Sequence, residues 1–188
     1  MADSPLMGST GVVSVAILSN GAAIADTVQI VSVEITYGVN KIPSAKIILL
    51  DGDMPSNDFP VSNADDFKPG AVITINAGYA NQTTTIFKGI VTKHGIKMDG
   101  DNFSRLIVQC RDSAVAMTIG RKNANFVDSK DSDVIGKLIG AYSGLTSDVT
   151  TTTTSFKELV QYYCTDWDFM LIRAEANGLL VTVDAGKV

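Results

Sequence analysis

The sequence is poor in the side chains on which most acid–base, thiol and zinc chemistry depends. It has one histidine, His94, and two cysteines, Cys110 and Cys164, among 188 residues. A nucleophilic site needs a nucleophile and a base held together, and a zinc site needs several Cys or His ligands. His94 follows Lys93 at the end of an apolar-alternating segment and has no Cys or His near it in the chain. We therefore expect no catalytic residue, no metal site and no cofactor, and predict that the protein is not an enzyme.

Targeting signals and long apolar runs are also missing. The first basic residue is Lys41, and Ser14 interrupts the apolar stretch 12–18. A secretory signal needs N-terminal positive charge and a longer apolar run, and a membrane span needs about 18–20 apolar residues. We expect synthesis in the cytoplasm without a signal peptide.

Positive charge is scarce, since 15 basic against 20 acidic side chains give a net charge of −5. The small basic group of Arg111, Arg121 and Lys122 is too small for useful nucleic-acid affinity, which requires several phosphates to be neutralised on one face. The 16 glycines form no phosphate-binding loop motif. We expect no nucleic-acid partner and no small-molecule substrate. Both cysteines are interpreted as reduced, packed thiols, because nothing in their spacing requires a disulfide.

Four Asp-x-Asp pairs suggest calcium ligands. A calcium loop of the helix–loop–helix type needs glutamate at its twelfth position. The pairs, each followed by the residue found at that position, are Asp51/Asp53 with Ser62, Asp99/Asp101 with Cys110, Asp131/Asp133 with Tyr142, and Asp166/Asp168 with Asn177. All four fail the test. We interpret the first two pairs as turns and the last two as acidic charge at helix N-termini.

Strand patterns dominate residues 10–112. Asn20-Gly21 is a hairpin-turn signal, because both residues tolerate positive φ. The nearly continuous apolar run Ser44–Leu50 is typical of a strand covered on both faces. The connection Asp51–Gly70 is interpreted as either a plain surface excursion or a protruding functional loop. The expected strands are Gly11–Leu18, Val28–Thr36, Ser44–Leu50, Ala71–Tyr79, Thr84–His94 and Arg105–Arg111. Such a series predicts an antiparallel barrel or sandwich.

Helical spacing begins after Asp112. Apolar residues from Val134 to Tyr142 predict a helix that Asp131 or Ser132 caps and Gly144 ends. We predict that residues 113–188 form a helical, α+β segment. The predicted fold class is therefore mainly β with α.

The stretch Ser155–Asn177 predicts two more helices with a break near Cys164. Ser155 with Glu158, and Thr165 with Asp168, both match the capping-box pattern. Gly178 suits the end of the second helix. Leu179–Asp184 then predicts a strand.

One aromatic cluster, Tyr162–Met170, stands out because it holds the only tryptophan of the chain. Trp167 and Phe169 are interpreted as core residues. Part of the remaining stripe is a candidate interface, since aromatic and methionine side chains are enriched in interfaces.

The segment Glu158–Gly178, with its Trp-Asp-Phe core followed by Arg-Ala-Glu and Gly, resembles the signature of the Vgr spike and phage late-control D family. Asn40-Lys41-Ile42-Pro43 resembles that family's start of a strand. Further strings follow in the family's order: Pro69-Gly70, Gly78-Tyr79, Phe87-Lys88-Gly89-Ile90-Val91, Arg111-Asp112 and Ser132-Asp133-Val134-Ile135. The resemblance runs from about Val28 to Gly178.

The resemblance implies a structural baseplate hub of a phage tail, a type VI secretion system or an extracellular contractile particle. Such hubs are trimers whose two tube-like barrels per subunit adapt a threefold spike to a sixfold tube. The barrel at 10–112 would be one of these, followed by a partial α/β insertion domain, and family members usually continue further. The implied partners are the tube protein, the spike tip and baseplate proteins, in a particle that can leave the cell. The alternative is a stand-alone barrel that binds a peptide or carbohydrate, and a hydrolase ranks third.

Overall fold

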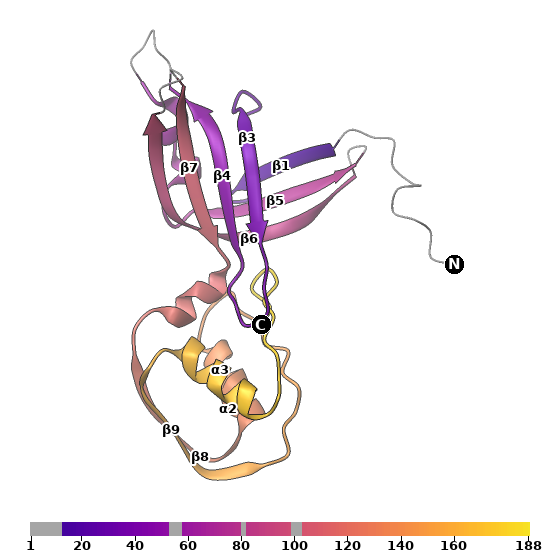
Figure 1. Ribbon diagram of the computed structural model, residues 1–188, viewed down its shortest axis with the longest axis vertical. Coiled ribbons are helices and arrows are strands. Elements are labelled where there is room, and N and C mark those ends of the chain that lie inside the picture. Colours follow the sequence, from indigo (N-terminus) through magenta and orange to yellow (C-terminus); the bar gives the residue numbers. More distant parts are fainter. Residues whose placement is uncertain (1–12, 53–57, 80–81, 99–102) are drawn as a thin grey trace, which may run out of the picture. The chain divides into compact units, whose positions relative to one another are not determined.

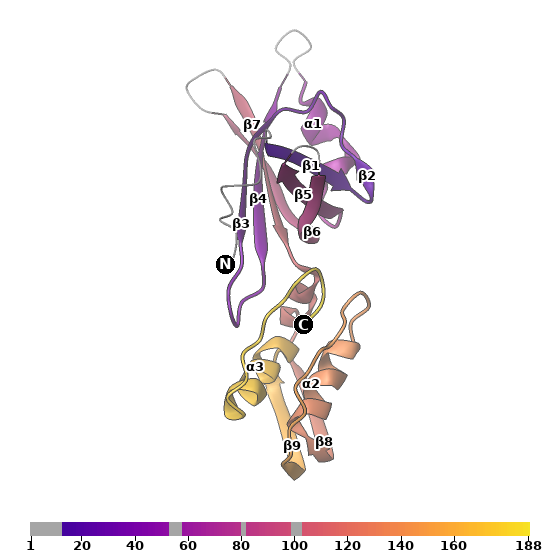
Figure 2. The same ribbon diagram turned by 90° about the vertical axis from the view of Figure 1, so that its right-hand side faces the viewer.

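The computed structural model describes residues 13–52, 58–79, 82–98 and 103–188. The chain divides into two compact units. The first unit comprises the described residues of Met1–Glu34 and Ala45–Cys110, and the second comprises Ile35–Ser44 and Arg111–Val188. Figures 1 and 2 show the strands of the first unit and the helices and strands of the second.

A seven-stranded sheet forms the first unit. A few residues at the ends of its strands belong to the second unit. Its hydrogen-bonded order is β2-β1-β5-β6-β7-β4-β3. Pairings of β1 with β2, β1 with β5 and β5 with β6 are antiparallel. The strands are β1 (Val13–Ser19), β2 (Ala22–Ala23), β3 (Ile30–Thr36), β4 (Ser44–Asp51), β5 (Val72–Tyr79), β6 (Gln82–Met98) and β7 (Ser104–Arg111). The predicted class, mainly antiparallel β with few helices, is confirmed. Closure of the sheet into a barrel stays a prediction.

The predicted turn at Asn20-Gly21 is confirmed. Ser19 and Ala22 pair across it, and both residues between them have positive φ, 49° at Asn20 and 86° at Gly21. Two left-handed residues match the right-handed twist of the flanking strands, which is why Asn-Gly suits this position.

The core of the first unit lies on one face of the sheet. In β4 the buried residues alternate, with Ala45, Ile47 and Leu49 inside and Lys46 exposed. The prediction that this strand is covered on both faces holds only in part, since Ile48 and Leu50 on the second face are half-buried while Lys46 is exposed. The other fully buried residues of this core include Phe67, Ile73, Ile75, Phe87, Val91, Leu106 and Val108.

The described part of the connection Asp51–Gly70 is packed against the sheet. It contains the short helix α1 (Pro60–Asn63) and the 3-10 turn η1 (Asp65–Phe67). The buried Asp51 carboxylate accepts hydrogen bonds from the amides of Val61 (3.0 Å) and Ser62 (2.8 Å). Phe67 is also buried in the core, so the described part of this connection is not a plain surface excursion.

Two helices cover one face of a two-stranded antiparallel sheet in the second unit (Figure 2). Phe126 and Leu159 from the strands meet Trp167, Phe169 and Met170 in one apolar cluster. The elements are η2 (Ser113–Thr118), β8 (Lys122–Lys130), α2 (Asp131–Gly140), β9 (Ser155–Cys164) and α3 (Asp166–Ala176). The sequence patterns missed β8, whose only buried apolar residue is Phe126.

Segment 155–164 is a strand, so the predicted first helix and its Ser155/Glu158 capping box are wrong. β9 pairs with β8, a partner that lies outside any local window. Thr165 does cap α3, since its hydroxyl accepts a hydrogen bond from the Asp168 amide at 3.0 Å. Gly178 follows that helix with φ 67°, as predicted.

The remaining helix limits differ slightly from prediction. Lys130 occupies the N-cap position of α2 without a capping side chain, and Asp131 and Ser132 lie inside the helix. The helix is capped at Ala141, before Gly144. Leu179–Asp184 is extended but forms no regular strand. Its backbone is fastened at Val181, which donates to Asn40 Oδ1 (2.9 Å) and accepts from the Asn40 amide (2.8 Å).

Candidate functional site

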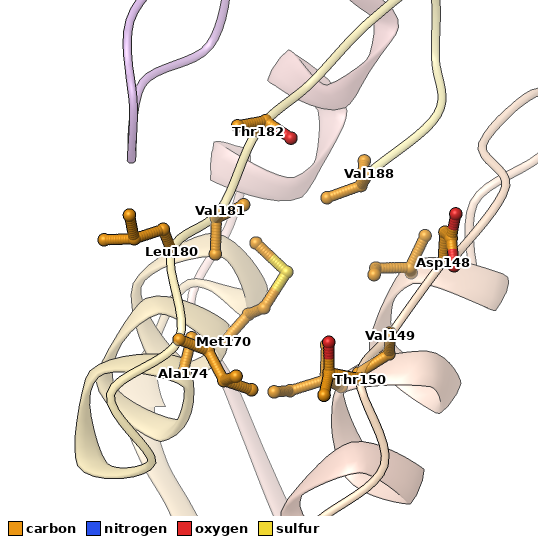
Figure 3. Close-up of a pocket in the computed structure, with 12 residues that line it drawn as sticks. Asp148, Val149, Thr150, Met170, Ala174, Leu180, Val181, Thr182 and Val188 are labelled. Carbon is orange, nitrogen blue, oxygen red and sulfur yellow. The ribbon is translucent and has the colours of Figure 1, made fainter.

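A pocket of about 100 Å³ opens beside α2 and α3 in the second unit. Figure 3 shows Met170 and Ala174 at its floor, with the extended segments 148–150 and 179–182 as its walls. Its polar side chains are Asp148, Thr150 and Thr182, and its other lining residues are Ile135, Ile139, Val149, Leu179, Leu180, Val181 and Val188. Among the described residues that line it, none is a histidine, cysteine or basic side chain. The pocket is therefore lined mainly by apolar side chains and holds no acid–base pair among them.

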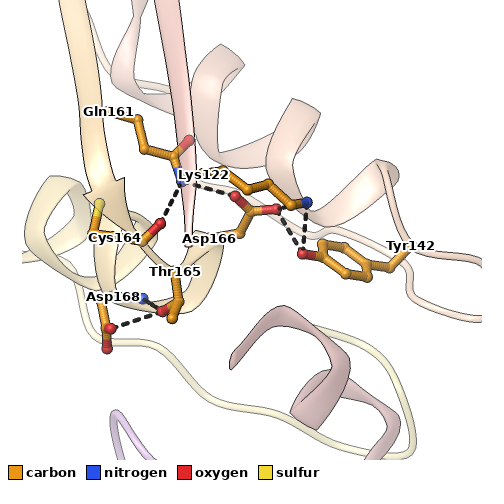
Figure 4. A network of polar contacts seen from close by, with 7 residues as sticks. All are labelled: Lys122, Tyr142, Gln161, Cys164, Thr165, Asp166 and Asp168. Atoms are coloured by element: carbon orange, nitrogen blue, oxygen red, sulfur yellow. Dashed lines mark hydrogen bonds and ion pairs between the residues drawn. The ribbon is translucent and has the colours of Figure 1, made fainter. Parts of the chain in front are cut away.

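A polar network centred on Asp166 joins both strands of this unit to the start of α3 and to Tyr142, in the turn after α2 (Figure 4). Asp166 is 2% exposed in the first turn of α3. Its Oδ2 accepts hydrogen bonds from Lys122 Nζ and from the Tyr142 hydroxyl, both at 2.6 Å. Its Oδ1 accepts from Gln161 Nε2 at 2.8 Å, and the same amide reaches the Cys164 carbonyl at 3.2 Å. The network fixes the end of β9 against the start of α3.

The ionic states in this network oppose acid–base catalysis. Burial tends to raise the pKa of Asp166, but hydrogen bonds from Gln161, Lys122 and Tyr142 and the lysine charge together lower it. The hydrogen bond to Asp166 raises the pKa of Lys122, and burial followed by the same carboxylate raises that of Tyr142. Each shift moves the group further from neutral pH, whereas a catalytic base needs a pKa near the working pH. The network is therefore a structural clamp.

A second clamp joins the start of α2 to the end of α3. The Arg173 guanidinium donates to Asp131 through Nε (2.5 Å) and Nη2 (3.0 Å), a bidentate pair. Asn177 Nδ2 adds a third hydrogen bond to Asp131 at 2.8 Å. Asp131 is 1% exposed, and the arginine also lies over the Phe156 ring at 5.1 Å. Burial tends to raise the pKa of Asp131, but its hydrogen bonds and the Arg173 charge outweigh that effect and lower it.

These two carboxylates should make the second unit sensitive to acid. A carboxylate whose pKa is lower in the folded than in the unfolded state stabilises the fold. This stabilisation is complete above the unfolded pKa of about 3.9, and it is lost as the pH falls through the pKa of the folded state. We expect the free energy of unfolding to fall below about pH 4. Urea unfolding followed by Trp167 fluorescence over a pH series measures it. The variant Asp166→Asn should show a shallower pH slope, and an unchanged slope would contradict the assignment.

Apolar side chains are exposed on the face of the β8–β9 sheet that points away from the helices. Val127, Val160 and Tyr162 are 60%, 59% and 81% exposed. Val160 pairs with Asn125, and Val127 pairs with Glu158. We call these five residues the β8–β9 outer face. The aromatic cluster of the sequence is thus divided, with Trp167 and Phe169 in the core as predicted and Tyr162 on this surface.

The first unit carries a second exposed apolar group on paired strands. Val13 of β1 lies opposite Tyr79 of β5, and both are more than half exposed. Val15, two residues along the same face of β1, is 43% exposed. Single exposed apolar residues are ordinary, but contiguous groups are typical of interaction surfaces.

The other sequence candidates have structural roles. His94 lies within β6, which continues to Met98, and its Nδ1 lies 3.1 Å from the Phe67 carbonyl. It is therefore not at a strand end. Of the expected basic group, Lys122 is engaged by Asp166 and Arg121 lies 5.0 Å from the Tyr163 ring centre.

Both cysteines are free, and burial raises the pKa of Cys110 to about 12. The pairs Asp131/Asp133 and Asp166/Asp168 occupy the first turns of α2 and α3, as predicted. Asp53, Asp99 and Asp101 lie outside the described residues. Within the described ranges, no cluster of three His, Cys, Asp or Glu side chains could hold a metal ion.

Two residues from the sequence strings that carry the family resemblance fix backbone segments within the second unit. Asn40, at φ 57°, holds Val181 through its side chain. Asp112 accepts from the amides of Ala114 (2.9 Å) and Gly186 (3.0 Å), so it caps η2 and fixes the distant segment at 186. The strings indicated these positions, but periodicity alone did not suggest a role for either side chain.

Comparison with known proteins places the sequence in a family. A family model described as the Alg8 N-terminal domain matches residues 9–188. The chain belongs to this family. A search of curated proteins finds no match. The matching model is not a Vgr domain, so the predicted Vgr and late-control D relationship is supported at the level of fold only.

Solved structures similar to this Alg8 N-terminal domain are tail and secretion proteins. The 43 kDa tail protein of prophage MuSo2 from Shewanella oneidensis matches with a TM-score of 0.72 at 14% identity, over 94% of this chain and 52% of that chain. A tail protein from Neisseria meningitidis MC58 matches with a TM-score of 0.66 at 12% identity, over 93% and 49%. The E. coli c3393 protein, a component of the type VI secretion system, matches with a TM-score of 0.60 at 14% identity, over 82% and 41%.

These likenesses show the fold. The chain spans about half the length of the tail proteins that it matches. In the described part of this Alg8 N-terminal domain, no helix has the length and apolar content of a membrane span.

Proposed function

We propose that this Alg8 N-terminal domain is a structural part of the baseplate hub of a contractile injection machine, where it adapts the spike to the tube. The observation that carries the proposal is the fold shared with the prophage tail protein over 94% of the chain at a TM-score of 0.72. The secretion-system protein from E. coli is described as structurally similar to bacteriophage T4 tail proteins gp27 and gp5, which extends the likeness to type VI systems.

The side-chain inventory supports a mechanical role. The second unit is tied together by two clamped carboxylates, and the ionic states of the Asp166 network oppose proton transfer. Exposed apolar residues lie on paired strands in both units, where they are available for contacts with other subunits. In this proposal the protein has no catalytic activity, assembles as a trimer, and contacts the tube protein, the spike tip and baseplate proteins. It is made in the cytoplasm and leaves the cell only within the particle.

The experiment is co-expression of the chain with the tube and spike-tip proteins of its own organism, followed by mass measurement and electron microscopy. We expect a threefold particle that retains the tube protein. The variant Tyr162→Asp should weaken that retention by about tenfold to thirtyfold, because an exposed tyrosine at an interface centre is worth about 2 kcal/mol. The fold should not change, since Tyr162 is 81% exposed.

The matched control is Glu175→Ala, an exposed substitution on α3 that leaves the β8–β9 outer face intact. It should retain the tube protein as the unmodified chain does. If the chain stays a monodisperse monomer, does not bind the tube protein and binds glycans, the hub proposal is wrong and the protein is a stand-alone binding module.

A further inference from the structure

Two asparagines of the chain, Asn20 and Asn177, stand directly before a glycine. Asparagine loses its side-chain ammonia most readily in this dipeptide, because glycine has no side chain to keep its backbone nitrogen away from the asparagine Cγ. The glycine nitrogen forms a bond to Cγ, and the Cγ–Nδ2 bond breaks. The proton of the glycine amide passes through water to Nδ2, which leaves as ammonia. A second water molecule opens the resulting succinimide ring to aspartate or isoaspartate.

At Asn177 the folded chain holds both reacting groups in hydrogen bonds. The leaving group, Asn177 Nδ2, donates to Asp131 Oδ2 and to the Arg173 carbonyl, both at 2.8 Å. The nucleophile, the Gly178 amide, donates to the Glu175 carbonyl at 2.9 Å. Attack on Cγ therefore requires all three of these hydrogen bonds to break.

The backbone of Asn177 also holds the nucleophile away from Cγ. Asn177 is the C-cap residue of α3, with φ −104° and ψ 6°. At this ψ the Gly178 nitrogen eclipses the backbone nitrogen of Asn177, whereas ring closure needs it near the Asn177 Cβ. The Cα–C bond must rotate before the reaction, and this rotation undoes the end of the helix.

The other pair, Asn20-Gly21, is less restrained. Both residues are exposed in the turn between β1 and β2. Asn20 Oδ1 accepts a hydrogen bond from the Val72 amide at 3.0 Å. Among the residues that the structure describes, neither Asn20 Nδ2 nor the Gly21 amide has a hydrogen-bond partner. Asn20 therefore serves as an internal comparison for Asn177.

Conversion of Asn177 would prevent the clamp of Asp131, Arg173 and Asn177 from re-forming. An aspartate would place a carboxylate oxygen where Nδ2 now donates to Asp131 and to the Arg173 carbonyl, both of which only accept. Asp131 is 1% exposed, so two negative charges would meet with little water to separate them. The new charge would also lie at the C-terminal end of α3, where the helix dipole disfavours it.

We propose that Asn177-Gly178 is a succinimide-forming modification site that the Asp131 clamp holds inactive. When the second unit opens, the Gly178 nitrogen reaches Cγ of Asn177 and ammonia is lost. The aspartate or isoaspartate that forms keeps the clamp from closing, so an opening long enough for the reaction becomes permanent. Water is the only co-reactant.

The test incubates the whole chain in mildly alkaline buffer over a urea series. The masses of the peptides that contain each pair report replacement of the amide by a carboxyl group. We expect the conversion rate of Asn177 to follow the fraction of unfolded second unit, measured by Trp167 fluorescence. It should be at least about tenfold slower in the folded than in the unfolded chain, because packed helices open only rarely.

The pair at Asn20 provides the comparison in the same sample. In the unfolded chain the two pairs should convert at similar rates, since their dipeptides are identical. In the folded chain Asn20 should convert faster than Asn177. An Asn177 rate that does not change with urea, or one that equals the rate of Asn20 in the folded chain, would overturn the proposal.

One variant examines the clamp directly. Asp131→Ala removes an acceptor of Asn177 Nδ2 and should speed conversion of Asn177 without urea by at least about tenfold, because breaking the buried ion pair makes opening more frequent. The control is Asp133→Ala, an exposed position in the same first turn of α2, which should leave the rate unchanged. Equal rates in the two variants would show that the clamp does not restrain the site.

Because Asp131→Ala can disturb folding, a second variant, Asn177→Asp, carries the product without the reaction. Its equilibrium constant for unfolding, from urea titration followed by Trp167 fluorescence, should rise by at least about tenfold. The matched control is Asn125→Asp at an exposed position of β8, which should stay within about twofold of the unmodified chain. Equal stability of the two variants would overturn the claim that conversion keeps the clamp open. None of these results bears on the baseplate role, because the samples contain no tube or spike protein.

Discussion

Replacement of Asp131 by alanine should lower the free energy of unfolding of the second unit by about 3–5 kcal/mol, because breaking a buried ion pair leaves its partner uncompensated. Arg173 would lose both of its hydrogen-bond acceptors on Asp131, and Asn177 would lose one. The guanidinium has little access to water in exchange, since the Arg173 side chain is 17% exposed.

Urea unfolding followed by fluorescence measures this loss. Trp167 is the only tryptophan of the chain and lies in the core of the second unit, so its emission reports on that unit. The control is Asp133→Ala, an exposed acidic residue in the same first turn of α2, which should cost about 0.3–1 kcal/mol through the helix dipole alone. Equal losses in the two variants would show that the Asp131 clamp adds nothing beyond the dipole.

Substitution of Gly78 by alanine should destabilise the first unit by about 3 kcal/mol or more, at the upper end of the cost of overpacking. A Cβ at Gly78 would lie 1.8 Å from the Gln82 carbonyl oxygen and 2.9 Å from Thr83 Cα. These are backbone atoms of the paired strand β6, so no side-chain rotation can relieve the clash. Ser14 pairs with Gly78 from the other side, which restricts movement of β5 as well.

The matched control is Gly95→Ala in β6, where a new Cβ meets nothing within 4 Å. Alanine there should be neutral or slightly stabilising, because it reduces the freedom of the unfolded chain. Thermal unfolding followed by far-ultraviolet circular dichroism compares the two variants, with Trp167 fluorescence as a reference for the second unit. If Gly78→Ala melts at the temperature of the control, the close approach of the two strands is wrong.

Local chemistry in the sequence predicted some elements well. The Asn20-Gly21 turn depends on two residues that tolerate positive φ, and the Thr165 cap depends on a hydroxyl three residues before an amide. Neither needs a distant partner, so each can be inferred from a few neighbouring residues.

The segment Ser155–Cys164 shows where such inference fails. Ser155 and Glu158 fit a capping box, yet the residues form β9. Phe126 and Leu159 pair across β8 and β9 and are buried together by the helices. Burial against an element distant in the chain outweighs a local capping preference of about 1 kcal/mol.

The sequence by itself determined the antiparallel β class, the acidic residues in the first turns of the helices, and the small number of side chains suited to catalysis. Composition and short-range patterns carry these properties. Only the tertiary structure decided that Asp131 and Asp166 are buried clamps, that Tyr162 is a surface residue while Trp167 is core, and that 148–150 and 179–182 line one pocket. Each of these depends on contacts between residues more than twenty positions apart or on the direction of a backbone edge. Spacing along the chain does not encode such relationships, since they arise when strands and helices pack.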